Sequence, residues 1–436
     1  MRPRTSLIAR SLLGAAFLSP FAVHATNGYF AHGYGMKSKG MAGAAVSQAQ
    51  DAFGGANNPA SMVWAGSRID MGVDWFSPQR KASRTGSMGG AFDFETKSSR
   101  SDFAIPEFGY NSMISDSMSL GITVYGNGGM NTDYDGGVAS CGFPGRPANA
   151  LCGRRGLGVD LMQLIIAPTV AWKFHPSHSV GIAPLFGYQR FKAKGLQAFD
   201  NAPGFPPFTG SPGNVTNRGN ENSTGWGVRV GYMGKISDMI TVGASYASKM
   251  RMSDLDKYRG LFAQGGGFDI PEHYALGVTL QPAPALQVSA DYEKIKYSGV
   301  RSVHNPSSNQ APLGAGNGPG FGWQDVDVFK LGVQWKFDDR LTLRAGYNHG
   351  DNPIRSQDVS FNILAPGVVK NHYTLGFTYV LAGGSEITMA YMHAARESVS
   401  GASFLNSPAL LGPGNGGREK IEMYENSLGI AWGTRF

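Results

Sequence analysis

The feature that most constrains this chain is a period of two along much of its length. Apolar side chains alternate with small or polar ones over segments of roughly ten residues, which is the pattern of a β-strand with two different faces. From Val326 to Phe337, for example, the large apolar residues fall on one face, and glycine, lysine and glutamine fall on the other. The same sorting recurs around Trp226 and around Tyr373. We therefore expect an all-β protein.

Fourteen such segments can be counted. They begin near Ser67, Phe103, Ser119, Val159, Val180, Thr224, Ile240, Phe268, Leu286, Trp323, Leu341, Val369, Glu386 and Lys420. Tight turns alternate with long connections between them, and an even strand number with short turns at one end only is typical of bacterial outer-membrane barrels. The pattern predicts a 14-stranded antiparallel transmembrane β-barrel over residues 67–436. A soluble β-sandwich would not need one class of loop to be systematically long.

Composition and the chain end agree with a barrel. Charged residues make up 16% of the chain, against about 25% in ordinary globular proteins. After residue 25 the chain contains no apolar run long enough for a membrane-spanning helix. Unpaired backbone groups are costly in hydrocarbon, so strands cross a bilayer only as a closed barrel. The last residues alternate from Leu428 to the terminal Phe436, an ending that resembles the signal read by the barrel insertion machinery.

The first 25 residues predict export. Arg2, Arg4 and Arg10 precede an apolar stretch, and Val23-His24-Ala25 forms a small-x-small cleavage site, so residues 1–25 are interpreted as a signal peptide. The net charge of +7 includes these three arginines. No basic run or basic patch interleaved with aromatic residues occurs, so no nucleic-acid partner is expected.

The two cysteines, Cys141 and Cys152, are close together in the sequence. In an exported protein this spacing predicts one disulfide that closes a loop. Two thiols with no histidine between them make a poor metal site, so no metal is expected there.

Residues 26–66 do not alternate and precede the first predicted strand. A barrel of this size leaves a wide lumen unless something fills it, and this segment, rich in glycine and alanine, is predicted to be the plug, or hatch. The GMAGAAV stretch, then Asp51 and Ala52, then Asn58-Pro59-Ala60 resemble the hatch of the FadL/TodX family of outer-membrane transporters for hydrophobic compounds. The resemblance extends over the mature chain in length, strand count and final Phe436.

The resemblance implies a route for the ligand. In that family a hydrophobic ligand is captured in an extracellular groove, passes to a lumenal pocket near the mature N-terminus and leaves sideways through an inward kink of the third strand. Here Gly126, Gly128 and Gly129 interrupt the alternation of that strand, and glycine inside a strand marks a bulge or a close approach of backbones. The alternative is that these glycines begin the following loop.

The ligand-binding residues are less constrained by the sequence. A fatty-acid pocket needs a cation for the carboxylate, and alternation places Arg229, Lys330 and Arg344 on the lumenal face. Aromatic or alkane ligands need no cation, and the family contains transporters of both kinds. Tyr29 and Phe30, near the mature start, are expected to make apolar ligand contacts.

The predicted function is passive uptake of long-chain fatty acids or of aromatic and aliphatic hydrocarbons across the Gram-negative outer membrane. Expected surroundings are outer-membrane lipid and lipopolysaccharide, and a monomer is expected. A general porin or surface adhesin is the alternative. No G-x-S-x-G nucleophile pattern occurs, so an enzyme is not expected, and no catalytic residues or cofactor are assigned. His32 is expected to form hydrogen bonds within the hatch.

Overall fold

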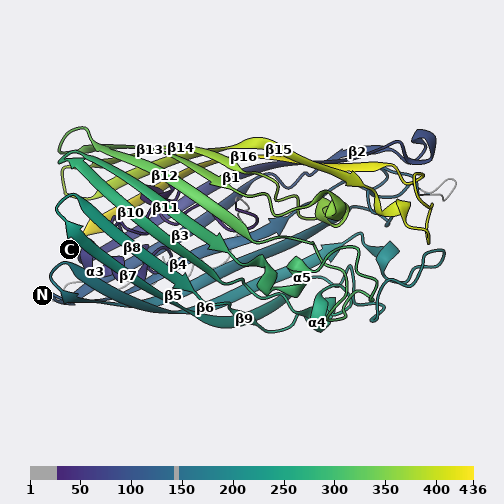
Figure 1. Ribbon diagram of the computed structural model, residues 1–436, viewed down its shortest axis with the longest axis horizontal. Helices are drawn as coiled ribbons and strands as arrows, with labels where there is room; N and C mark the ends of the chain where they lie inside the picture. Colours follow the sequence, from purple (N-terminus) through teal and green to yellow (C-terminus); the bar gives the residue numbers. More distant parts are fainter. Residues whose placement is uncertain (1–26, 142–146) are drawn as a thin grey trace, which may run out of the picture.

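The protein is a closed antiparallel β-barrel in a computed structural model that describes residues 27–141 and 147–436 (Figure 1). The predicted signal peptide lies outside the described residues. Fourteen strands of the described chain form the wall: β1 (Arg68–Thr85), β3 (Phe103–Ser115), β4 (Met118–Asn131), β5 (Gly158–His175), β6 (His178–Lys194), β7 (Glu221–Ser237), β8 (Ile240–Ala247), β10 (His273–Ala283), β11 (Leu286–Ile295), β12 (Val326–Lys336), β13 (Leu341–Gly350), β14 (Asn371–Val380), β15 (Glu386–Ala402) and β16 (Arg418–Arg435).

Each wall strand pairs with its neighbours in sequence, and β1 pairs with β16 from Arg68↔Arg435 to Thr85↔Arg418, which closes the barrel. Two short strands, β2 (Phe94–Lys97) and β9 (Arg251–Met252), extend the sheet beside β1 and β7. All fourteen predicted strands are present. The largest error is at β10, which begins five residues after the predicted Phe268 because Pro271 has no N–H to donate to a ladder.

The outward face of the wall is apolar. Trp226 is 69% exposed and Leu375 is 63% exposed, and the predicted apolar face of β12 likewise points outward at Phe329 and Trp335. The alternate residues, such as Thr374, are buried in the interior. A band of exposed apolar side chains on a closed barrel is the surface that lipid covers. No helix in the described part of the chain is both long and apolar enough to cross a membrane.

The wall is not of equal height around its circumference. Strands β15, β16 and β1, like β5, β6 and β7, have 17 or 18 residues, whereas β8 has 8 and β10 to β14 have 10 or 11. About 9–11 residues suffice to cross the bilayer. The long strands therefore continue beyond the membrane-facing band at the long-loop end, and loops carrying α4 (Ala263–Gly266) and α5 (Arg301–His304) lie there (Figure 1).

Residues 27–66 fill the barrel. They include α2 (Met36–Lys39), the 3-10 turn η1 (Pro59–Ser61) and α3 (Met62–Ala65), and most of their side chains are buried. Short 3-10 turns in the long loops complete the described structure: η2 (Ser87–Gly90), η3 (Gln197–Phe199), η4 (Asp256–Tyr258), η5 (Tyr297–Gly299), η6 (Ser356–Asp358), η7 (Phe361–Ile363) and η8 (Phe404–Asn406). The predicted fold, a plugged 14-stranded barrel, is confirmed.

Candidate functional site

The Asn58-Pro59-Ala60 motif rests directly on the barrel wall. The Asn58 side chain accepts a hydrogen bond from the Ala60 N–H (3.1 Å) and donates to the carbonyl oxygens of Val46 (2.7 Å) and Tyr232 (2.9 Å). On the wall beneath it, a β-carbon added at Gly231 would overlap the Asn58 side chain. The motif thus ties two parts of the hatch to β7, and it needs a glycine opposite it.

Other lumen-facing glycines do the same for the rest of the hatch. A β-carbon at Gly181 would overlap the backbone of Pro59, one at Gly243 the carbonyl of Val46, and one at Gly332 the side chain and backbone of Met41. Much of the high glycine content of the strands therefore serves close approach of hatch and wall. Alternation placed Gly332 on the face opposite the large apolar residues of β12, but it did not indicate what this glycine contacts.

Arg229 faces the lumen as alternation predicts, and it is held by the hatch. Its guanidinium donates to the carbonyl oxygens of Gly55 (2.8 Å) and Ala56, and it lies 2.8 Å from the Nε2 of His273. The side chain is 1% exposed. Arg229 is thus a hatch anchor on β7, and both of its terminal nitrogens are engaged by protein groups.

The other two predicted cations are also paired with protein groups. Lys330 forms an ion pair with Glu293 at 2.7 Å. Arg344 donates from Nε to Gln334 (2.8 Å) and from Nη1 to Thr378 (2.7 Å). Both lie on the lumenal face as predicted. Their contacts belong to the wall around the hatch.

Acidic side chains of the wall, which sequence reasoning missed, carry much of the hatch attachment. One carboxylate oxygen of Asp291 accepts from the N–H groups of both Ala45 (2.8 Å) and Val46 (2.9 Å). Asp74 pairs with Lys39 at 2.9 Å. Burial of a carboxylate without such partners costs free energy. An acidic residue at a lumen-facing strand position was therefore the sequence signal that could have predicted a contact with the hatch.

The first described residues form an aromatic cluster with the long connection between β11 and β12. The Tyr29 ring lies 5.3 Å from Tyr297 and 5.9 Å from Trp323 between centroids, and the Tyr29 N–H donates to the Tyr297 hydroxyl (3.1 Å). Phe30 packs edge-on against His273 at 5.1 Å. The predicted hatch residue His32 is buried, and its ring stacks on that of His372, with centroids 6.2 Å apart.

Strand pairing in the barrel wall is interrupted between β3 and β4, and this unpaired stretch is called the gap. Their pairing ends at Phe108↔Val124, although β3 continues to pair with β1 as far as Phe103 and β4 continues to pair with β5 as far as Asn131. Pro106 lies in the part of β3 that faces the gap. Proline has no N–H for a ladder and is found on edge strands, so this stretch of β3 has the character of an edge.

The three predicted glycines lie inside β4, at the point where it leaves β3. The register of β4 against β5 shifts between Gly126 and Gly128, which is a bulge at Asn127. Beyond it, Gly129 donates to the Tyr29 carbonyl (3.1 Å) and the Ala31 N–H donates to the Asn127 carbonyl (3.3 Å). The hatch thus replaces β3 as the partner of β4, and a β-carbon at Gly128 would overlap the Tyr29 carbonyl.

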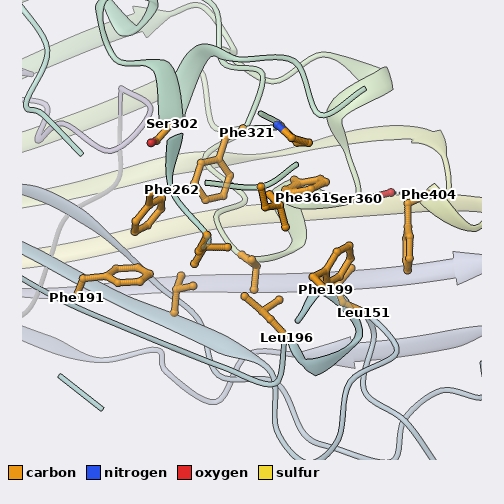
Figure 2. Close-up of a pocket in the computed structure, with 16 residues that line it drawn as sticks. Leu151, Phe191, Leu196, Phe199, Phe262, Ser302, Phe321, Ser360, Phe361 and Phe404 are labelled. Carbon is orange, nitrogen blue, oxygen red and sulfur yellow. Dashed lines mark hydrogen bonds between the residues drawn. The ribbon is translucent and has the colours of Figure 1, made fainter. Parts of the chain in front are cut away.

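An apolar pocket lies among the long loops (Figure 2). It contains about 600 Å³ of space between atoms, part of it open to solvent. Side chains from the connections after β4, β6, β8, β11, β13 and β15 converge on it, with phenylalanine as the dominant type; those labelled in Figure 2 include Phe191, Phe199, Phe262, Phe321, Phe361 and Phe404.

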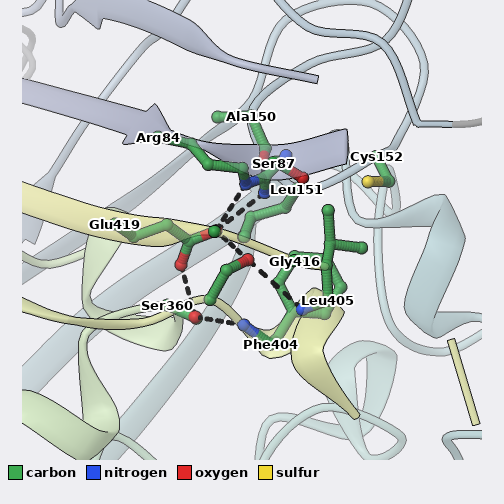
Figure 3. A network of polar contacts seen from close by, with 12 residues as sticks. Arg84, Ser87, Ala150, Leu151, Cys152, Ser360, Phe404, Leu405, Gly416 and Glu419 are labelled. Carbon is green, nitrogen blue, oxygen red and sulfur yellow. Dashed lines mark hydrogen bonds and ion pairs between the residues drawn. The ribbon is translucent and has the colours of Figure 1, made fainter. Parts of the chain in front are cut away.

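A buried polar network holds the loops over this pocket (Figure 3). The Arg84 guanidinium donates to one oxygen of Glu419 from Nε (3.0 Å) and Nη2 (2.7 Å), and both side chains are 0% exposed. Ser403 donates to the same oxygen (2.8 Å), and Ser360 donates to the other. Arg84 also donates to the Ala150 carbonyl (2.9 Å). Two strands and three loops thereby meet at one ion pair.

The predicted disulfide is confirmed: Cys141 and Cys152 are bonded in the loop between β4 and β5. Leu151, next to Cys152, lines the loop pocket. The disulfide thus lies beside one wall of that pocket.

The space on the other side of the hatch is polar. At the tight-turn end a vestibule of about 1020 Å³, part of it open to solvent, is lined by amide and charged side chains, including Gln48, Gln50, Gln334, Lys37 and Arg344. The hatch therefore separates an apolar pocket on the loop side from a polar vestibule on the turn side. Among the described residues, no cluster of three or more His, Cys, Asp or Glu could hold a metal ion.

Solved structures of the same fold are known. The chain is similar to the toluene transporter TodX of P. putida (TM-score 0.69, 18% identity, 93% of this chain and 99% of that chain covered). It is also similar to a Pseudomonas aeruginosa FadL homologue (0.65, 16%, 96% and 100%) and to the Ralstonia pickettii toluene transporter TbuX (0.62, 14%, 93% and 99%). No curated protein matches the sequence.

At the level of sequence, the family described as "Outer membrane protein transport protein (OMPP1/FadL/TodX)" matches residues 21–407. That match covers most of the chain, including the hatch and all strands up to β15. The chain therefore belongs to the FadL/TodX family of Gram-negative outer-membrane β-barrel transport proteins.

Proposed function

We propose that this protein is a passive channel that takes hydrophobic small molecules from the outside and releases them sideways into the outer membrane. The relatives TodX and TbuX are named as toluene transporters, and another is named as a FadL homologue. These names favour aromatic hydrocarbons or fatty acids as ligands. In this proposal the loop pocket receives the ligand, and the gap between β3 and β4 releases it.

The observation that carries the proposal is the height of the gap. The unpaired part of β3 pairs on its other side with β1, where Met71 lies opposite Phe108 and Trp75 opposite Ala104. Met71 and Trp75 are 45% and 56% exposed and belong to the apolar outward band. The unpaired stretch therefore lies at the level that lipid covers, which supports release of the ligand into the membrane.

A sideways route also avoids an unfavourable step. Burial of apolar surface contributes about 25 cal/mol per Å², so a hydrocarbon that crossed the polar vestibule would lose most of that stabilisation. A ligand that moves from an apolar pocket to lipid remains out of water throughout. The hatch, anchored by Asn58, Asp291 and Arg229, blocks the aqueous alternative.

Uptake by cells tests the function. Cells that produce the protein should accumulate labelled toluene or labelled oleate faster than cells that lack it. Liposomes that contain the purified protein should not swell in small sugars faster than empty liposomes. Equal accumulation in the two strains, together with rapid sugar swelling, would favour a general porin instead.

A single substitution tests the sideways route. A β-carbon at Gly126 would lie 3.2 Å from Cγ2 of Ile105 across the gap, so the side chain of Gly126→Leu should press against Ile105 and obstruct a route between β3 and β4. We expect uptake to fall at least tenfold. The matched control is Gly383→Leu in the turn between β14 and β15, where an added β-carbon meets nothing within 4 Å. Uptake by Gly126→Leu at the rate of the control would refute the lateral exit.

A further inference from the structure

One buried arginine on the turn side of the hatch has no acidic partner. Arg344 of β13 is 7% exposed, and among the ion pairs of the described residues none includes it. Its Nε donates to the amide oxygen of Gln334 (2.8 Å) and its Nη1 donates to the hydroxyl of Thr378 (2.7 Å), and both of these partners are neutral. A guanidinium stays charged in a protein, so no contacting group balances the positive charge of Arg344.

The third nitrogen of this guanidinium faces the polar vestibule. Nη2 forms no hydrogen bond within the described chain, yet its neighbours do not seal it off. Because Arg344 lines the vestibule, the N–H groups of Nη2 are open to that space. The acids that act on Arg344 from a longer distance are Asp51 and Glu386, and neither lines the vestibule. Glu386 is already paired with Lys37 and Arg68.

Three side chains of neighbouring strands form a row that ends at this arginine. Gln287 of β11 is opposite Gln334 of β12, which in turn is opposite Arg344 of β13. The Gln334 amide nitrogen donates to the Gln287 oxygen (3.1 Å), and the amide nitrogen of Gln287 has no partner in the described chain. Arg344 and Gln287 thus contact the two ends of one amide group, and both line the vestibule with open donors.

The hatch reaches the same row. Nε2 of Gln50 lies 3.3 Å from the Gln334 oxygen that accepts from Arg344. Gln50 also lines the vestibule. A ligand held at Arg344 would therefore lie next to the wall and to the hatch.

The charged groups around the vestibule are mostly positive. Among the described residues its charged lining consists of one acid and four cations, namely Asp238, Lys37, Lys235, Arg344 and Arg435. Lys37 is paired with Glu386, whereas no ion pair in the described part of the chain includes Lys235 or Arg435. A cleft lined mainly by one sign of charge concentrates ions of the opposite sign. The vestibule therefore favours anions over cations.

The open groups of the row select the ligand by charge and by hydrogen-bonding type. Nη2 of Arg344 and the amide nitrogen of Gln287 are donors only, so the ligand has to supply acceptor atoms. A carboxylate or a phosphate supplies several acceptor oxygens together with the missing negative charge, and such charge-assisted hydrogen bonds are stronger than neutral ones. We propose that Arg344, with Gln287 beside it, binds a small oxyanion, a carboxylate or a phosphate, on the turn side of the hatch.

Titration of the purified protein in a non-ionic detergent tests this assignment. The probes are inorganic phosphate, acetate and the neutral polyol erythritol at constant ionic strength, and binding is measured from line broadening of the phosphorus or carbon NMR signal of each probe. We expect saturable binding of at least one anion, and the tighter anion identifies the class of oxyanion. Erythritol that binds as tightly as either anion, or the absence of saturable anion binding, would overturn the proposal.

Substitution of the arginine by glutamine locates the site. Arg344→Gln removes the charge but keeps an amide like those around it, so the affinity for the preferred anion should fall about tenfold or more through loss of a charge-assisted hydrogen bond. The matched control is Arg340→Gln, in the exposed turn before β13 and outside the vestibule lining, which should bind like wild type. Equal affinity of Arg344→Gln and the control would overturn the assignment.

Crystals of the wild-type protein give an answer even if Arg344→Gln does not fold. After soaking in selenate, or in a brominated carboxylate if acetate is the preferred probe, an anomalous peak should lie within hydrogen-bonding distance of Arg344 Nη2. A vestibule without such a peak, at a concentration that saturates binding in solution, would overturn the proposal.

This inference goes beyond the proposed function, and the two can fail separately. The oxyanion site lies on the other side of the hatch from the loop pocket. If cells take up toluene or oleate but the purified protein binds no oxyanion, only the oxyanion site falls. If the protein binds an oxyanion at Arg344 but cells that produce it take up neither hydrophobic probe faster than cells without it, only the transport proposal falls.

Discussion

Replacement of Glu419 by glutamine should loosen the loops over the pocket without opening the barrel. Glu419 accepts two hydrogen bonds from Arg84 and one each from Ser360 and Ser403, and it is the only acid paired with Arg84 among the described residues. Glutamine keeps the size and one acceptor oxygen but leaves the buried Arg84 charge without a counter-charge. We therefore expect local opening to become easier only in the strands and loops that meet at the Arg84–Glu419 ion pair.

The size of the free-energy change follows from the burial of both side chains of this ion pair. Removal of one partner of a fully buried ion pair costs about 3–5 kcal/mol. We take the lower figure, because glutamine retains one acceptor. Since about 1.4 kcal/mol corresponds to a factor of ten, the equilibrium constant for local opening of the loops should rise about 100-fold.

Hydrogen–deuterium exchange resolved by peptide measures this opening. Amides of residues 351–370 and 403–417 should exchange about 100-fold faster in Glu419→Gln, while those of residues 27–66 should be unchanged. The control is Glu95→Gln, whose carboxylate is 62% exposed and pairs with Lys81, and which should change exchange little. Unchanged loop exchange in Glu419→Gln, or an equal change in the control, would refute the reasoning.

Three further changes test other contacts. Gly128→Ala should push Tyr29 away from β4 and raise ion conductance in planar bilayers; unchanged conductance would contradict the hatch–strand contact. Arg229→Met removes the donors to two hatch carbonyls and should speed liposome swelling in small sugars, whereas swelling at the wild-type rate would show that the hatch does not depend on it. Replacement of Cys141 and Cys152 by serine should destabilise their loop by about 2–3 kcal/mol, seen as faster loop proteolysis; resistance equal to wild type would argue against this.

The barrel was predictable because its signal is repeated and local. Each strand carries its own alternation, so an error at one end, as at β10, does not propagate to the others. The same alternation placed Arg229, Lys330 and Arg344 on the lumenal face.

The partners of the inward-facing residues were not predictable in the same way. Alternation assigns a residue to a face, but Arg229 contacts Gly55 only because of how residues 27–66 fold. The loop pocket is assembled from six separate connections without periodicity, so nothing in any one of them indicates it.

The unequal strand lengths give the mouth of this barrel a slanted rim. The wall is tall at β15, β16 and β1 and again at β5 to β7, with β3 and β4 of intermediate length between them, and it is low from β8 to β14. A molecule that approaches along the membrane surface on the short side meets loops alone, whereas one arriving from the opposite side meets sheet.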